Sequence, residues 1–127
     1  MGPVTRGGPS LYEALGEGVF RALVDAFYRR VEADPELRRI FPPDLTEGRE
    51  KQFLFLTQLF GGPARYTEQH GDPRLRFRHL PFAIGRAERD RWVDHMHAAI
   101  AEVAIPEPSA SVLREYFDQF SLHMINR

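Results

Sequence analysis

The feature that most constrains the fold is a long segment rich in glycine, proline and arginine, which runs from Gly61 to about Gly85. It starts with Gly61-Gly62-Pro63, directly after an apolar run, and it contains one histidine, His79. Connections of this length are uncommon in compact domains and usually serve a function. We therefore expect the rest of the chain to pack around one unusual loop.

Apolar residues recur at helical spacing on both sides of this loop. Four helices are expected before the loop: Ser10–Leu15, a second that contains Val19 and Val31, a short third that begins at Asp34-Pro35 and ends at Phe41-Pro42-Pro43, and a fourth from Asp44 to Phe60. Two are expected after it: a long helix from Gly85 that ends at Pro106 and Pro108, and a last helix that contains Val112 to Met124. Ser10 with Glu13 fits a capping box, and Asp34 fits an N-cap. No segment alternates in the manner of a strand. The sequence predicts an all-α domain of four major helices and two short ones.

Composition excludes several classes of function. The 127 residues fit one domain, and a formal net charge of −1 argues against a nucleic-acid binder. The absence of cysteine excludes disulfides, thiolate zinc sites and iron–sulfur clusters. No apolar run approaches the length of a membrane span, and residues 1–9 resemble a flexible lead-in without a signal-peptide core. We expect a cytoplasmic protein with no membrane span and no nucleic-acid partner.

His79 lies on a short, proline-bounded segment that is expected to face apolar helices. A histidine in that setting can serve as an axial ligand of a haem iron. Arginines beside it, such as Arg78, can pair with haem propionates through a bidentate fork. The alternative is a hydrogen-bonded core or surface histidine, with Arg74 and Arg76 on a solvated edge.

Three hydrogen-bond donors occur on otherwise apolar helical faces: Tyr28, Gln52 and Trp92. Each needs a partner if it is buried, and each could be a satisfied core residue. Together they could line a pocket across from His79. Bound dioxygen carries partial negative charge, so donors to it form partly charge-assisted bonds.

Other kinds of site are poorly supported. His95 and His97 are two residues apart on a helix and face different ways, so we expect both on the solvated surface rather than as a metal pair. No serine or cysteine has the context of a nucleophile, and the glycine fingerprint of dinucleotide binding is missing.

Several motifs, taken together, resemble those of the truncated haemoglobins, and specifically their second group. The segments that carry the resemblance are Phe27-Tyr28, Ile40-Phe41-Pro42, Gly61-Gly62-Pro63, Tyr66, Gly71-Asp72-Pro73-Arg74-Leu75-Arg76-Phe77-Arg78-His79, Pro81-Phe82 and Glu88-Arg89-Asp90-Arg91-Trp92. The match covers about residues 10–127. It implies a two-over-two helical sandwich around a single haem b, with residues 10–127 as the globin domain.

The resemblance also implies roles for individual residues. His79 corresponds to the proximal iron ligand, Tyr28 to the distal tyrosine, and Trp92 to a tryptophan that offers its indole N–H to the ligand. Gly48 falls at the distal gate, which it leaves open, and Gln52 adds a third donor. Further implied contacts with the macrocycle or its propionates come from Phe41, Lys51, Phe55, Leu56, Tyr66, Leu75, Arg78, Phe82 and Met96.

The function implied by this resemblance is reversible binding of dioxygen and other diatomic ligands, for oxygen transport, scavenging or sensing. A redox enzyme, either a nitric oxide dioxygenase or a peroxidase-like protein, is the alternative, and it requires a reductase that no motif identifies. A haem-free helical interaction domain is a remote alternative. Both a monomer and a homodimer are compatible with the sequence.

Overall fold

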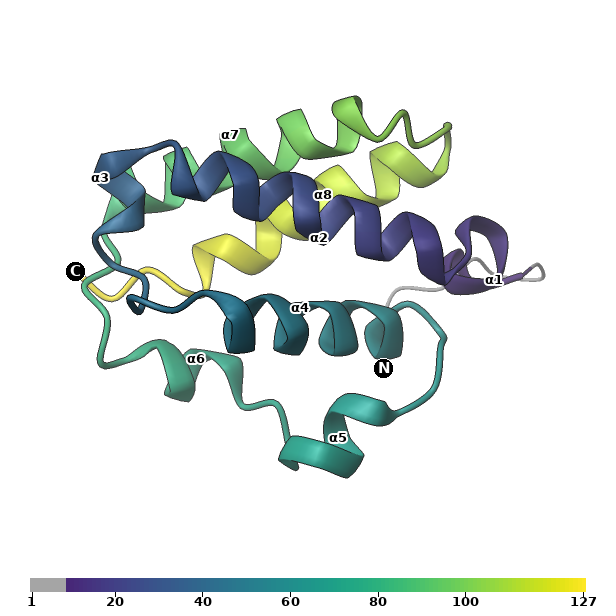
Figure 1. Ribbon diagram of the computed structural model, residues 1–127, viewed down its shortest axis with the longest axis horizontal. Helices are drawn as coiled ribbons and strands as arrows, with labels where there is room; N and C mark the ends of the chain where they lie inside the picture. Colours follow the sequence, from purple (N-terminus) through teal and green to yellow (C-terminus); the bar gives the residue numbers. More distant parts are fainter. Residues whose placement is uncertain (1–8) are drawn as a thin grey trace.

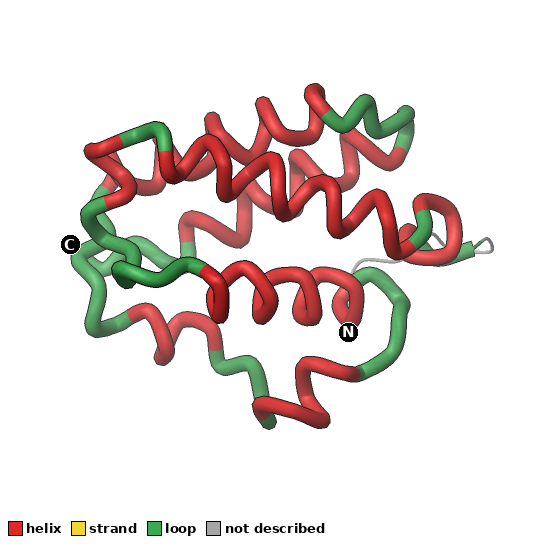
Figure 2. Tube along the Cα trace, viewed as in Figure 1, coloured by secondary structure: helices red, strands yellow, loops and turns green. Residues whose placement is uncertain are grey.

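The computed structural model describes residues 9–127, which form eight helices and no strand (Figures 1 and 2). The helices are α1 (Leu11–Leu15), α2 (Glu17–Glu32), α3 (Pro35–Arg38), α4 (Thr46–Leu59), α5 (Arg65–His70), α6 (Leu75–His79), α7 (Arg86–Glu102) and α8 (Ser109–Leu122). The lead-in expected at residues 1–9 lies outside the described residues, except for Pro9. The all-α prediction is confirmed.

The four long helices form two pairs, α2 with α4 and α7 with α8. Helix α2 packs against α4 and also against α7, and α7 packs against α8. Figure 1 shows α5 and α6 below α4, away from the other long helices. The core between the pairs contains fully buried aromatic rings, among them Phe20, Phe27, Phe60 and Phe117. The second half of α4 is buried on several sides, as its apolar composition predicts.

The double glycine after α4 is required by close packing against the start of the chain's first helix. Gly61 has a φ of +106°, and a Cβ at this position would lie 2.4 Å from the Cβ of Ser10. A Cβ at Gly62 would lie 2.7 Å from the carbonyl oxygen of Thr57. The amide of Tyr12 donates to the carbonyl of Phe60, at 2.9 Å. Only glycine permits this approach of α1 to the end of α4.

The caps predicted at Ser10 and Asp34 are present. Ser10 and Glu13 form the reciprocal capping box, and the Asp34 carboxylate accepts from the amide of Glu36 at 3.1 Å. The Asp44 carboxylate accepts from the Thr46 amide at 2.9 Å, so α4 begins at Thr46. The last helix begins at Ser109, ahead of the apolar stripe that predicted it.

The segment from residue 61 to residue 85 is not the continuous loop that the sequence predicts, because it contains α5 and α6. Both helices are short, with six and five residues. The N-cap of α6, Arg74, has a left-handed backbone with a φ of 43°, and no residue of α6 is buried. An element without an apolar stripe or a side-chain cap leaves no periodic signal to detect.

His95 and His97 are half-buried at the surface, and each has a carboxylate partner. The Nε2 atom of His95 lies 2.7 Å from a carboxylate oxygen of Asp34, and Arg91 donates to the same carboxylate. The Nε2 atom of His97 lies 2.8 Å from the carboxylate of Asp118 on α8. Both partners come from distant parts of the sequence, so a helix-spacing argument cannot find them.

Candidate functional site

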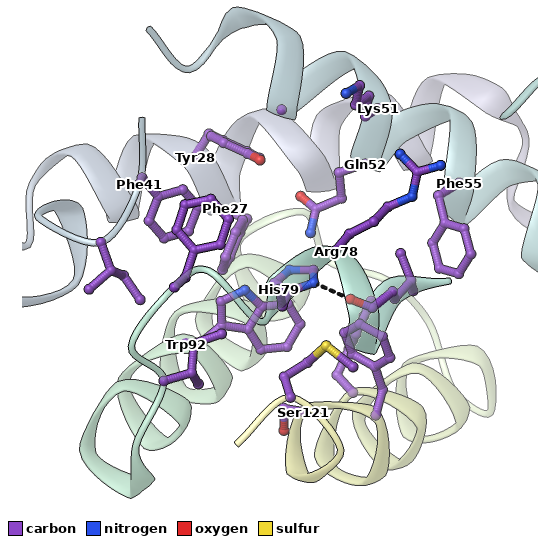
Figure 3. Close-up of a pocket in the computed structure, with 18 of the residues that line it drawn as sticks. Phe27, Tyr28, Phe41, Lys51, Gln52, Phe55, Arg78, His79, Trp92 and Ser121 are labelled. Carbon is purple, nitrogen blue, oxygen red and sulfur yellow. Dashed lines mark hydrogen bonds between the residues drawn. The ribbon is translucent and has the colours of Figure 1, made fainter. Parts of the chain in front are cut away.

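A cavity of about 620 Å³ lies between α2 and α4, the α6 segment, and α7 with α8. Its volume falls within the range of pockets that bind cofactors and other small molecules. Most of the candidate site residues line it: Tyr28, Phe41, Gly48, Lys51, Gln52, Phe55, Leu56, Tyr66, Leu75, Arg78, His79, Phe82 and Trp92. Figure 3 shows Tyr28, Gln52, His79 and Trp92 among the side chains around this space. Met96 is fully buried in the core and is not among the lining residues.

His79 is the last residue of α6, and its half-buried ring projects into this cavity (Figure 3). Its Nδ1 atom lies 2.6 Å from the carbonyl oxygen of Leu75. A carbonyl can only accept, so Nδ1 carries the proton and donates it. The Nε2 atom then keeps its lone pair. Metal-binding histidines commonly have this arrangement, in which a second acceptor fixes the tautomer.

Tyr28 on α2 is 5% exposed and is surrounded by aromatic rings. The rings of Phe27 and Phe41 pack edge-on against it, with centroids at 5.5 and 6.1 Å. Burial raises the pKa of Tyr28 to about 12, so its hydroxyl is protonated at neutral pH. A Cβ at Gly48 would lie 3.1 Å from that hydroxyl oxygen, so glycine at this point of α4 leaves room for it.

Three polar groups of the cavity form no hydrogen bond within residues 9–127. They are the buried Oε1 atom of Gln52, the Tyr28 hydroxyl and the Trp92 indole N–H. The Trp92 ring packs edge-on against Phe27 and Phe117, at 5.3 and 5.7 Å. A buried polar atom without a partner costs about 1–3 kcal/mol. The Gln52 Oε1 atom is such a group, and it lines the same apolar cavity as the Tyr28 hydroxyl and the Trp92 indole, which indicates a site for a ligand that forms hydrogen bonds.

Cationic groups occur at the edge of the cavity. Lys51 forms an ion pair with Glu47 at 2.7 Å, and Arg78 donates to the carbonyls of His70 and Asp72 at 3.0 and 3.2 Å. Tyr66 is 3% exposed. An apolar interior with a cationic rim suits a planar apolar molecule that carries acidic groups. The residues present therefore fit a haem, which needs an imidazole, an apolar slot and partners for two propionates.

Comparisons with known proteins agree with this geometry. A family model described as "Bacterial-like globin" matches residues 10–126. The group 2 truncated hemoglobin YjbI of Bacillus subtilis is 46% identical over 116 residues, which span 91% of this chain and 88% of that relative. The chain belongs to the truncated haemoglobins.

Solved structures of truncated haemoglobins share this fold. The hemoglobin of the thermophilic bacterium Chloroflexus aurantiacus superposes with a TM-score of 0.92 at 55% identity, covering 94% of this chain and all of that one. The group II truncated hemoglobin of Bacillus anthracis gives a TM-score of 0.91 at 40% identity, covering 95% and 94% of the two chains. The two-over-two fold and the group II resemblance predicted from sequence are thus confirmed. Membership of this family implies a haem cofactor and the binding of diatomic ligands.

Sequence reasoning missed part of the pocket wall of this truncated haemoglobin. The unpredicted lining residues are Phe27, Ile40, Pro42, Asp44, Glu47, Ile84, Glu88, Arg89, Tyr116, Phe117, Phe120, Ser121 and Met124. Phe27 and Phe117 lie on apolar helical stripes, and such a stripe indicates burial but not whether a residue faces a core or a cavity. Ser121 accepts from Arg89 at 2.9 Å, and neither residue type suggested a site.

No helix among residues 9–127 has the length and apolar character that crossing a membrane requires. In the same part of the chain, no three histidine, cysteine, aspartate or glutamate side chains gather where they could hold a metal ion. His79 is the histidine that lines the cavity.

Proposed function

We propose that residues 10–127 form a single truncated globin domain that holds haem b in the cavity and binds dioxygen reversibly, with His79 as the protein ligand of the iron. One observation carries the proposal: the His79 ring faces an apolar cavity while its Nδ1 atom lies on the Leu75 carbonyl, and the same cavity contains the buried, unpaired Oε1 atom of Gln52. The match of the family model to residues 10–126 supports the extent of the domain.

A haem held in this cavity would supply an iron able to bind a diatomic molecule, and His79 would be its protein ligand. His79 offers Nε2 for this role because the Leu75 carbonyl holds its proton on Nδ1. The same hydrogen bond orients the ring and raises its basicity. The apolar side chains of Phe41, Phe55 and Leu56 exclude water from the slot.

Tyr28, Gln52 and Trp92 come from three different helices and serve as donors to the diatomic ligand. The Tyr28 hydroxyl keeps its proton at neutral pH because burial holds its pKa near 12. Each hydrogen bond to a partly charged acceptor contributes about 1.5–3 kcal/mol. Three donors favour slow release of dioxygen, which suits scavenging or sensing better than bulk transport.

Lys51, Tyr66 and Arg78 fit the propionates at the cavity edge. The Arg78 guanidinium lies close to two backbone carbonyls, which hold it in place from the side of the chain. A guanidinium matches a carboxylate in a bidentate fork. Lys51 would exchange part of its contact with Glu47 for a propionate, at a small cost because that ion pair is at the surface.

The rate of oxygen release tests the proposal. Replacement of Tyr28 by phenylalanine removes one donor and keeps the ring packing, so release should become about 10- to 100-fold faster. Tyr12→Phe is the matched control, because the Tyr12 hydroxyl donates to Glu17 at the surface and is not part of the cavity. An unchanged rate in Tyr28→Phe would show that the hydroxyl does not contact the ligand.

A further inference from the structure

The segment that carries His79 is not held in place by apolar packing. Helix α6 has five residues, none of them buried, and the nearby side chains of Phe77 and Leu80 are 61% and 50% exposed. A helix of this length is unstable by itself. Other interactions must therefore fix the position of the histidine.

The C-terminal tail, residues 123–126, supplies these interactions through Asn126. The side-chain amide of Asn126 donates to the carbonyl of His79 at 3.2 Å and to the carbonyl of Phe82 at 2.8 Å. Its side-chain oxygen accepts from the amide of Ile84 at 3.0 Å. Its backbone amide donates to the Ile84 carbonyl at 2.8 Å. Asn126 thus bridges both ends of the segment 79–84.

Arg76 makes a second connection between α6 and the tail. Its guanidinium donates to the carbonyl of His123 and, at 3.3 Å, to the carbonyl of Ile125. Met124, between them, is buried and lines the cavity. Among the hydrogen bonds of residues 75–84, within the described part of the chain, those to the tail are the ones that reach a distant part of the sequence.

We propose that Asn126 is a positioning residue for the proximal histidine, and that the C-terminal tail clamps the His79 segment against the haem cavity. The proposal rests on the proposed function, because it takes His79 as the iron ligand. An asparagine suits the position because its two N–H groups face two carbonyls and its oxygen faces an N–H. The clamp acts on how firmly haem is held, without a contact between Asn126 and the haem.

The test compares three variants of the protein: Asn126→Ala, Asn126→Asp and, as a control, Arg127→Ala, which alters the exposed residue directly after the tail. Aspartate keeps the acceptor for Ile84 but loses both donors to the carbonyls. Three quantities are measured: the rate of haem transfer to an excess of apomyoglobin, the iron–histidine stretching band of the ferrous protein, and amide hydrogen exchange of residues 79–84 in the haem-free protein.

We expect haem release to be about tenfold faster in Asn126→Asp, which loses two hydrogen bonds, and at least as fast in Asn126→Ala, which loses three. The iron–histidine band should shift or broaden, and amides 79–84 should exchange faster while those of α2 keep their wild-type protection, which shows that the fold is intact. Arg127→Ala should match the wild type. A wild-type release rate and band in Asn126→Ala would overturn the clamp, and a wild-type Asn126→Asp would overturn the role of the two donors.

Failure of the clamp is distinguishable from failure of the proposed function. If His79→Ala loses its haem spectrum while Asn126→Ala releases haem at the wild-type rate, the iron ligand stands and only the clamp is wrong. If His79→Ala keeps the wild-type haem spectrum, His79 is not the iron ligand, and both the proposed function and the clamp are wrong.

Discussion

The two sides of the cavity are built in different ways. Tyr28 and Gln52 lie on α2 and α4, helices of 16 and 14 residues with many buried side chains. His79 ends α6, which has five residues and none of them buried. The donors proposed for the diatomic ligand therefore lie on helices fixed by the hydrophobic core, whereas the proposed iron ligand lies on a segment that hydrogen bonds connect to the C-terminal tail.

Because of this difference, substitutions on the two sides of the cavity should have different effects. A large buried side chain contributes several kcal/mol through burial and packing, whereas a single hydrogen bond contributes about 0.5–1.5 kcal/mol net. Changes in the core should alter the stability of the fold and the distal donors together. Substitutions in the tail should alter the position of the His79 segment with little effect on the stability of the whole fold.

The largest expected effect is on the free energy of unfolding, and it is measured by comparing Phe27→Ala with Phe77→Ala. Phe27 is fully buried between the rings of Tyr28 and Trp92, so its truncation should reduce the free energy of unfolding by about 3–5 kcal/mol. Phe77 is 61% exposed beside the proximal histidine, and its truncation should cost less than about 0.5 kcal/mol. Urea unfolding of the haem-free proteins measures both. Equal losses would remove the distinction between the two sides.

Trp92→Phe sharpens the distal half of the comparison. Phenylalanine keeps an aromatic ring against Phe27 and Phe117 but removes the indole N–H. Oxygen release, followed by stopped flow, should become about tenfold faster. A wild-type rate would mean that packing, and not donation, is the function of this side chain.

Asp34 tests whether a charge contributes to the stability of the fold where α3 contacts α7. The hydrogen bond from His95, together with Arg91, lowers the pKa of Asp34. A lowered pKa in the folded state contributes stability above the ordinary aspartate pKa, and this stability is lost as pH falls through the folded-state value. Asparagine is an equally good N-cap, so Asp34→Asn keeps the cap while it removes the charge and one of the two accepting oxygens. The variant should be less stable than wild type at pH 7, and the gap should shrink below about pH 4. A gap that persists at low pH would exclude the carboxylate charge as its cause.

The smallest expected effect is that of Gly48→Ala. Alanine favours the exposed turn of α4 by up to about 1 kcal/mol, but its Cβ would lie 3.1 Å from the Tyr28 hydroxyl, closer than ordinary contact. The hydroxyl must shift by a few tenths of an ångström. We expect a small gain in thermal stability and a change in oxygen release well below that of Tyr28→Phe. A change as large as that of Tyr28→Phe would show that Gly48 controls the donor.

The contrast between long, buried helices and short, exposed ones also explains which elements the sequence could predict. The long helices were predictable because α2, α7 and α8 carry apolar stripes, and Tyr28, Trp92 and His79 were recognisable from local motifs. Helices α5 and α6 were not, because they have few buried residues and no side-chain caps. The clamp by Asn126 was also out of reach, since its partners lie 42 to 47 residues away and are backbone groups, which leave no trace in the sequence.

The most direct test of the whole account is haem titration of the apoprotein, followed by absorption, for wild type, His79→Ala and His70→Ala. His70 is the matched control, because it is a half-buried histidine on α5 beside Tyr66 and does not line the cavity. The account predicts a Soret band that saturates at one haem per chain in wild type and His70→Ala, and a lost or strongly altered band in His79→Ala. A His79→Ala spectrum identical to that of wild type would contradict it.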